Sequence, residues 1–336
     1  MPTKPTPGKL KGLKAVSDAR GVIAAAAMDQ RGSLQKSIAA ARGGSASDDD
    51  LVVFKELVTK TLTRYASAIL LDPEYGLPAA RQRNDAGLLL AYEKTGYDSA
   101  TPGRLPDLLD LWSVRRLKEA GADCIKILLY YTPYEKPEIN NLKQAWIERI
   151  GDECRYHDIP FFMEPVGYDE NGKGEKTLEY AQKKPSVVAK TMEEFGKERY
   201  GIDILKVEVP VEMTFVEGTK AFKGEKAYTR EQALQYFRDA EATTDKPFIY
   251  LSAGVTNPIF IETLALAGES GTKFNGVLCG RATWYDGIKI YAQDGAKAFE
   301  HWLDTTGVEN IKNVNEALKA ATPWYTKFGA ASLDEL

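Results

Sequence analysis

Short apolar runs recur along the chain, and helix-patterned segments separate most of them. Eight such runs can be counted, and they read "GVIAAAAMD", "SAILLDPE", "GLLLAYE", "CIKILLYY", "PFFMEPV", "ILKVEVP", "FIYLSAG" and "NGVLCGR". Nearly continuous apolar strands that alternate with amphipathic helices are typical of a parallel sheet covered by helices. Eight units between Gly21 and Arg281 predict the α/β class and a (β/α)8 TIM barrel, which uses roughly 250 residues.

A doubly wound sheet stays open as the alternative, because it uses the same local pattern. The stretch "YGLPAARQRNDA" between the second and third runs is also too short for a full helix. No linker or internal repeat divides the chain, so we expect one domain over residues 16–336 after a flexible N-terminal segment, 1–15. The aromatic tail from Ala320 carries Trp324, Tyr325 and Phe328, and we expect it to pack on another surface, such as that of a neighbouring subunit.

Two stretches predict helices by their local pattern. The segment "LPDLLDLWSVRRLKEAG" ends at Gly121, a typical C-terminal glycine, and its apolar face carries Leu105, Leu108, Leu109 and Trp112. Thr229 and Gln232 have the spacing of a capping box and predict a helix start. The polar loop "GGSASDDD" precedes a further helix, and its aspartates complement the helix dipole.

The sixth run places a lysine among β-branched residues. Side chains alternate along a strand, so Leu205, Val207 and Val209 face the helices, while the barrel interior receives Ile204, Lys206 and Glu208. The same alternation points Cys124, Lys126 and Leu128 inward on the fourth run, and Glu164 inward on the fifth. Such a cluster is either a structural ion-pair network or a reactive site. A lysine desolvated beside a second ammonium can lose its proton, and the neutral amine attacks carbonyls.

The other strand ends meet at the barrel's C-terminal mouth, where active sites of this architecture form. Asp29, Gln30 and Arg31 follow the first run, and Asp72 follows the second. The seventh and eighth runs are followed by small residues and an arginine, namely Ser252, Gly254, Gly280 and Arg281. These last two loops are the usual phosphate site of such barrels, because small residues admit backbone N–H groups and arginine adds a charge-assisted fork. An anionic sugar fits this mouth.

Composition narrows the classes of partner. The net charge is −4 with no Lys/Arg block, so we expect no nucleic acid partner. The start "MPTKPTPGKLKGLKAV" has no apolar h-region of a signal peptide, and no run approaches the roughly 18 apolar residues of a membrane span, which predicts a cytoplasmic protein with no membrane partner. Cys124, Cys154 and Cys279 are far apart and odd in number, and we expect them reduced and buried.

We also expect no metal and no cofactor. The chain has two histidines, His157 and His301, and both lie in predicted helices, whereas a His-ligated zinc site needs several at the strand ends. The stretch "GYDENGKG" resembles a phosphate loop, but Gly174 follows Lys173 where a serine or threonine should bind magnesium. We therefore interpret it as a glycine-rich loop.

Longer stretches of the chain resemble a known family. "ILLDPEYGLP", "GLLLAYEKTGY", "LLYY", "IPFFMEP", "LKVEVPVEM", "IYLSAGV" and "KFNGVLCGRATW" are similar to tagatose 1,6-bisphosphate aldolases of the class I, Schiff-base type. The resemblance spans residues 21–307. It implies a (β/α)8 barrel that cleaves tagatose 1,6-bisphosphate into dihydroxyacetone phosphate and glyceraldehyde 3-phosphate.

The resemblance also implies roles for residues at matching positions. Lys206 would form the Schiff base, Glu164 would be the general acid and base, and Lys126 would be the neighbouring cation. Asp29 would help handle the C4 hydroxyl proton. The 1-phosphate would be held by Ser252, Gly254, Gly280 and Arg281, and candidates for the distal phosphate are Gln30 and Arg31.

Two other functions stay open at this point. The first is a related Schiff-base aldolase for another anionic ketose, such as a sulfonated sugar phosphate. The second is a sugar-phosphate-binding regulatory protein that acts through a partner. The family resemblance also leaves the oligomeric state open, with a homo-oligomer as one possibility, and we expect loose stereospecificity at C4.

Overall fold

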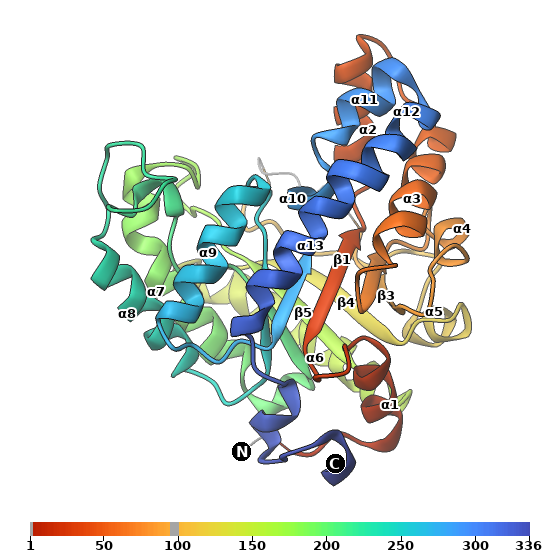
Figure 1. Cartoon of the computed structure of the whole chain (residues 1–336). Helices are drawn as coiled ribbons and strands as arrows, with labels where there is room; N and C mark the ends of the chain where they lie inside the picture. The colour runs from red at the N-terminus through yellow and green to blue at the C-terminus, as the bar shows by residue number, and fades with distance from the viewer. Residues whose placement is uncertain (1–2, 95–100) are drawn as a thin grey trace.

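The computed structural model describes residues 3–94 and 101–336. Residues 95–97, the end of "GLLLAYEKTGY", lie outside the described residues. Eight parallel strands close a barrel in chain order, from β1 beside β2 to β8 beside β1 (Figure 1). The strands are β1 Ile23–Met28, β2 Ala68–Leu71, β3 Gly87–Ala91, β4 Cys124–Tyr130, β5 Phe161–Val166, β6 Ile204–Val207, β7 Phe248–Leu251 and β8 Gly276–Cys279. The predicted TIM barrel is confirmed, and a doubly wound sheet, which is open, does not describe it.

Helices connect the strands and cover the outer face of the barrel. Their bounds are α1 Pro7–Ala15, α2 Gly32–Arg42, α3 Asp48–Leu62, α4 Leu77–Ala80, α5 Val114–Glu119, α6 Pro137–Tyr156, α7 Leu178–Phe195, α8 Arg230–Glu241, α9 Asn257–Glu269, α10 Arg281–Trp284, α11 Gly287–Asp294, α12 Ala296–Trp302 and α13 Val308–Ala317. The capping box of Thr229 and Gln232 is present at the start of α8, and Ser47 and Asp50 form a second one at α3. The short second connection holds only the single turn α4, as its length predicts.

The helix expected over residues 105–121 is wrong in its first half. The helix α5 begins only after Ser113, whose hydroxyl accepts a hydrogen bond from the Arg116 N–H. The residues before it extend the end of β3 instead, because the Leu109 N–H donates to the Tyr92 carbonyl at 3.0 Å. Leu109 is buried there against the strand end, whereas Leu105, at the start of the expected helix, is 46% exposed.

The predicted alternation of inward and outward side chains is confirmed along most of the barrel. One buried cluster fills the interior and includes Cys124 of β4, Phe162 of β5 and Ile204 of β6. A second cluster lies between the strands and the helices and contains Ile125, Leu205 and further outward residues. All three cysteines are free and buried, as expected.

The base of the barrel differs from the sequence-based expectation. Residues 7–15, expected in a flexible segment, form α1, and Leu13 of this helix is fully buried with the interior cluster. The aromatic tail packs on the same end of its own barrel: Trp324 is buried, and its indole N–H donates to the Ser17 hydroxyl at 2.8 Å. Both termini therefore lie together below the strands (Figure 1). Apolar side chains from the two ends bury each other, which orders a segment that looks polar alone.

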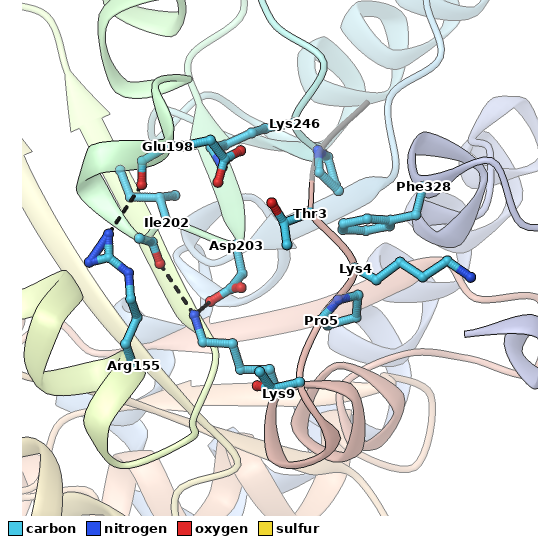
Figure 2. A pocket seen from close by; sticks show the side chains of 13 residues that line it. Thr3, Lys4, Pro5, Lys9, Arg155, Glu198, Ile202, Asp203, Lys246 and Phe328 are labelled. Atoms are coloured by element: carbon cyan, nitrogen blue, oxygen red, sulfur yellow. Dashed lines mark hydrogen bonds and ion pairs between the residues drawn. The ribbon is translucent and has the colours of Figure 1, made fainter.

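A cavity of about 330 Å³ lies beside this basal closure. Figure 2 shows Lys9 of α1 directed at Asp203, with their charged groups 2.8 Å apart. Thr3, Pro5 and Phe328 line the side formed by the chain ends. None of the helices in the described ranges is both long and apolar enough to cross a membrane.

Candidate active site

Lys206 lies near the middle of the barrel interior, on β6. Its side chain is 5% exposed, and its Nζ lies 2.8 Å from Glu164 Oε1. Glu164 comes from the neighbouring strand β5, and its other oxygen lies 2.9 Å from Lys126 Nζ of β4. Three consecutive strands therefore place a carboxylate between two ammonium groups, as the alternation of side chains predicts.

Lys126 is surrounded by carboxylates. Its side chain is fully buried, and its Nζ lies 2.8 Å from Asp29 Oδ2 and 2.7 Å from Glu93 Oε1, in addition to Glu164. Burial alone would lower the pKa of Lys126, but the charges of Asp29, Glu164 and Glu93 outweigh it and raise that pKa well above its ordinary value. Lys126 is therefore a permanent cation in this site.

Burial and neighbouring charges also act in opposite directions on the pKa values of two of the carboxylates. Burial would raise the pKa of Glu164 and of Asp29, but the ammonium groups of Lys126 and Lys206 outweigh burial and lower both pKa values. Both groups are therefore ionised in the free protein at neutral pH. A carboxylate in contact with a lysine amine can exchange a proton with it directly, and Glu164 lies within that reach of Lys206.

The backbone around Asp29 is held by a lysine that the sequence analysis did not single out. Lys55 of α3 is fully buried and donates to the carbonyls of Met28 and Gln30, both at 2.7 Å. Its Nζ also lies 2.6 Å from Asp72 Oδ1. Asp72, expected at the mouth, is thus buried against Lys55, and the pair fixes the residues on either side of Asp29.

Glu93 is a member of the cluster that sequence reasoning missed. It follows β3 by two residues and is 2% exposed. Leu89 and Ala91 of β3 face the interior, and Glu93 continues the same alternation. The signal was therefore present in the sequence, but it lay just beyond the apolar run.

Glu208 does not join the cluster, although its alternation along β6 predicted that it would. β6 ends at Val207. Beyond that point Glu208 turns outward, accepts a hydrogen bond from the Gly167 N–H at 2.7 Å and lies 3.4 Å from Lys184 Nζ of α7. It serves the packing of α7 on the barrel.

The loops after β7 and β8, which the sequence predicts to hold a phosphate, lie against each other at the barrel mouth. Gly254 has φ +74°, and a Cβ at this position would lie 2.6 Å from Arg281 Cζ. The guanidinium of Arg281 therefore packs directly on the backbone of the other loop, and Arg281 itself is exposed at the mouth. Ser252 is buried at the end of β7. Gly280 lies against β1, because a Cβ there would be 3.0 Å from the Ala27 carbonyl oxygen.

The two residues predicted to bind the distal phosphate, Gln30 and Arg31, differ in their hydrogen-bond partners. Arg31 is 3% exposed, and its guanidinium donates to Glu74 and to the Glu93 carbonyl, both at 2.7 Å. Arg31 is therefore engaged between two loops, and its assignment to the distal phosphate stays a prediction. Gln30 lies on the side of Gly280, and its Oε1 is buried without a hydrogen-bond partner among the described residues.

Another cation lies at the carboxyl ends of β4 and β5. The guanidinium carbon of Arg104 is 4.9 Å from the ring centroids of both Tyr130 and Tyr168, and its Nη2 lies 3.0 Å from Glu175. Stacking between two aromatic rings holds such a group in place. No pattern in the sequence pointed to it.

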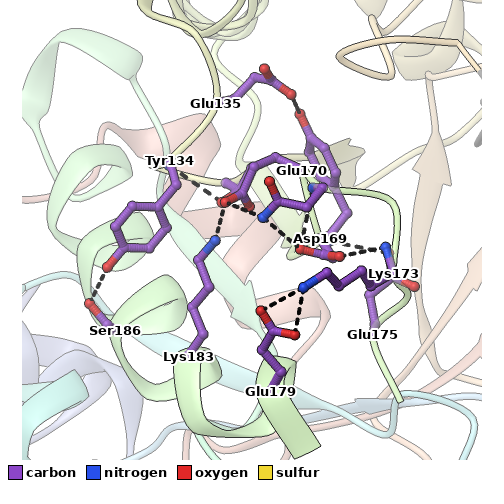
Figure 3. Close-up of polar contacts among 12 residues, drawn as sticks. Tyr134, Glu135, Asp169, Glu170, Lys173, Glu175, Glu179, Lys183 and Ser186 are labelled. Carbon is purple, nitrogen blue, oxygen red and sulfur yellow. Dashed lines mark hydrogen bonds and ion pairs between the residues drawn. The ribbon is translucent and has the colours of Figure 1, made fainter. Parts of the chain in front are cut away.

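The loop between β5 and α7 carries Glu175 and is the stretch we interpreted as glycine-rich. Figure 3 shows it held to α7, with Lys183 directed at Glu170 and Lys173 at Glu179. Asp169 closes the turn by accepting the Lys173 backbone N–H at 2.7 Å. The structure thus shows a loop that its own polar side chains hold closed.

No group of three or more His, Cys, Asp or Glu within residues 3–94 and 101–336 has the arrangement of a metal site. The three clustered carboxylates surround the ammonium of Lys126. What the arrangement can do chemically is proton transfer at the buried amine of Lys206.

Comparisons with known proteins identify this combination of fold and site. The model of the DeoC/LacD family of aldolases matches residues 23–286. Tagatose 1,6-diphosphate aldolase 2 of Enterococcus faecalis is 55% identical over 324 residues, which cover 96% of this chain and 97% of the relative. Tagatose 1,6-diphosphate aldolase of Listeria monocytogenes is 51% identical over 327 residues, 97% of this chain and 96% of the relative.

A solved structure supports the fold alone. Fructose-bisphosphate aldolase of Plasmodium falciparum superposes with a TM-score of 0.69 at 14% sequence identity, over 96% of this chain and 98% of that one. The family match and the long, closely similar relatives go further. The chain belongs to the DeoC/LacD family of aldolases.

Proposed function

We propose that this chain is a class I aldolase that cleaves D-tagatose 1,6-bisphosphate into dihydroxyacetone phosphate and D-glyceraldehyde 3-phosphate through a Schiff base on Lys206. One observation carries the proposal: Lys206 Nζ lies 2.8 Å from Glu164 Oε1 inside the barrel, and Lys126 holds the other oxygen of Glu164 at 2.9 Å. The names of the relatives at 55% and 51% identity support the choice of substrate.

The first steps build the imine. Glu164 takes a proton from the Lys206 ammonium, and the neutral amine attacks the C2 ketone to give a carbinolamine. Glu164, now protonated, donates to the departing hydroxyl, so water leaves and a protonated imine remains. Lys126 stays charged throughout and stabilises the carboxylate each time it forms again.

The imine then acts as the electron sink for cleavage. A base removes the C4 hydroxyl proton, the C3–C4 bond breaks, and its electron pair moves to C3 to form the enamine as the aldehyde leaves. Asp29 is the candidate base, because its lowered pKa keeps it ionised and able to accept a proton, and Lys126 orients its Oδ2 at 2.8 Å. Protonation of C3 and hydrolysis of the imine release dihydroxyacetone phosphate and regenerate the amine.

Substrate anchoring rests on the loops after β7 and β8. Ser252, Gly254, Gly280 and Arg281 are proposed to hold the 1-phosphate, with the exposed guanidinium of Arg281 as its counter-ion. For the distal phosphate we keep Gln30 and Arg31, and we add the stacked cation Arg104. Tagatose and fructose bisphosphates differ only at C4, where Asp29, Glu164 and water offer alternative acceptors. We therefore propose that both epimers are cleaved.

The test is cleavage of the two purified epimers, followed by a coupled reductase assay for dihydroxyacetone phosphate. We expect turnover of both, with kcat/KM values that differ by far less than about 10⁴-fold. A preference beyond that factor would mean a rigid C4 site. The matched control is Lys206→Met, which should keep the fold and lose turnover.

Two other results would replace the proposal. Turnover of a sulfonated ketose phosphate without turnover of either bisphosphate would assign the chain to another anionic ketose. Tight binding of a bisphosphate without any cleavage would favour a regulatory role. The assembled set of Lys206, Glu164 and Lys126 favours catalysis over that second reading.

A further inference from the structure

Glu93 has no role in the steps above, but it contacts Lys126, which takes part in them. We infer that Glu93 is a positioning residue for the aldol cleavage: it takes one N–H of Lys126, so that the other two are directed at Asp29 and Glu164. The inference rests on the proposed function, because it assigns Glu93 an effect on the same reaction.

Each of the three N–H donors of the Lys126 ammonium has a carboxylate partner. An ammonium has three N–H donors, and Lys126 Nζ has carboxylate oxygens of Glu93, Asp29 and Glu164 at 2.7, 2.8 and 2.9 Å. The side chain is fully buried. Without Glu93, one donor would have no anion, and the ammonium could rotate or shift toward the remaining two. Such a shift would move the two carboxylates that exchange protons with Lys206 and the substrate.

Glu93 is itself held by the backbone around it. Its carbonyl accepts from Arg31 Nη2 at 2.7 Å, and its neighbour Tyr92 donates its N–H to the Lys126 carbonyl at 3.0 Å. Glu93 also forms an isolated antiparallel bridge with Leu108. These contacts fix where the side chain starts and which way it points.

The second oxygen of Glu93 is the unusual feature. Oε2 is buried and has no hydrogen-bond partner among the described residues. An unpaired buried polar atom costs stability, and burial raises the pKa of Glu93 above its ordinary value, although the charges of Lys126 and Arg31 act to lower it. The charge of the carboxylate is therefore the part to test.

That charge alters the proton balance of the cluster. Glu93 faces Lys126 on β4, Arg31 after β1, and Asp29 at the end of β1, with Glu164 on the far side of Lys126 and Glu74 on the far side of Arg31. Like charges raise one another's pKa, so Glu93 opposes the lowering that the lysines impose on Asp29. Removing its charge should let both catalytic carboxylates hold their protons less tightly.

The test compares Glu93→Gln with the wild type in the cleavage of fructose and tagatose 1,6-bisphosphates as a function of pH. Glutamine keeps an oxygen for Lys126 but removes the charge. We expect kcat to fall about 10- to 100-fold, as displacements in a catalytic cluster do, with KM within about threefold. The acid limb of kcat/KM should move about 0.5 to 1 unit lower in pH. A wild-type kcat and an unmoved acid limb would overturn the inference.

Two control variants separate the effect of the position of the Glu93 carboxylate from the effect of its charge and from a general loss of stability. Glu93→Asp keeps the charge but withdraws it from Lys126, so kcat should fall while the acid limb stays at its wild-type pH; an Asp variant with wild-type kcat would contradict a positioning role. Glu74→Gln removes a carboxylate from Arg31 that does not touch Lys126, and should leave both readouts unchanged.

Failure of this inference can be told apart from failure of the proposed function. If the wild type forms no borohydride-stable adduct with dihydroxyacetone phosphate, the Schiff-base function itself is wrong. If the wild type forms it and Glu93→Gln behaves as wild type in rate and pH profile, only the role of Glu93 is wrong.

Discussion

Replacing Lys126 by methionine tests how strongly the site depends on its central cation. The change removes one ammonium from contact with Asp29, Glu93 and Glu164, which are 13%, 3% and 9% exposed. Breaking a buried ion pair by removing one partner typically costs about 3 to 5 kcal/mol. Since three carboxylates lose their partner here, we expect at least that loss in the free energy of unfolding at pH 8.

The loss should depend on pH, and its sign follows from the pKa directions. In the wild type the pKa values of Asp29 and Glu164 are lowered, so their ionised forms add stability above the unfolded-state pKa of about 4, and this is lost as pH falls. Without Lys126, burial is opposed less and these pKa values rise. A carboxylate with a raised pKa destabilises the fold as pH rises through that value. The variant should therefore regain stability on acidification.

The size of this recovery can be bounded. One pKa unit for one carboxylate corresponds to about 1.4 kcal/mol, most of which is regained only once the pH falls to the unfolded-state pKa of about 4, so moving from pH 8 to pH 4 should recover at least about 1 kcal/mol. Reversible urea unfolding at the two pH values measures it. The control is Lys60→Met, which breaks an exposed pair with Glu300 and should cost less than about 1 kcal/mol at either pH. An equal loss for Lys126→Met at both pH values would mean that Lys126 does not lower the pKa values of these carboxylates.

Three further outcomes are expected. Arg281→Ala should raise KM for the tagatose and fructose bisphosphates by a similar factor, because the 1-phosphate is anchored before the stereocentre is read; a selective effect on one epimer in steady-state kinetics would contradict this. Activity should survive dialysis against EDTA, whereas full loss that zinc or magnesium restores would assign a metal to Asp29 or its neighbours. Lys55→Met should destabilise the fold by about 3 to 5 kcal/mol in urea, since Asp72 loses its buried partner, and a loss below about 1 kcal/mol would mean that this pair is not structural.

The barrel and the core of its site were predictable because one physical rule governs both. Alternation along a strand sorts Lys206, Lys126 and Glu164 to the interior, and a charge in an apolar run is visible in the sequence alone. To apply this rule, one must also know where each strand ends, and the sequence does not mark those ends sharply. Glu93 continues the alternation of β3 past its last strand residue, whereas Glu208 departs from that of β6 once the strand stops at Val207.

Other features depend on contacts between distant segments. Residues 105–113 match a helical spacing, but their backbone bonds to the end of β3 decide their conformation. The helix α1 is stable where it is because Leu13 is buried in the same apolar cluster as Trp324, more than 300 positions later in the chain. Arg31 looked like a free cation until Glu74 and the Glu93 carbonyl were placed beside it. Local pattern cannot supply such partners.

Covalent chemistry at Lys206 can be tested by trapping the imine that it forms with a ketose phosphate. The protein is incubated with dihydroxyacetone phosphate, reduced with borohydride, digested and mapped by mass spectrometry. We expect one adduct of a reduced triose phosphate on the peptide that contains Lys206, and none in Lys206→Met. An adduct on Lys126 or another lysine, or no adduct from protein that cleaves its substrate, would contradict it.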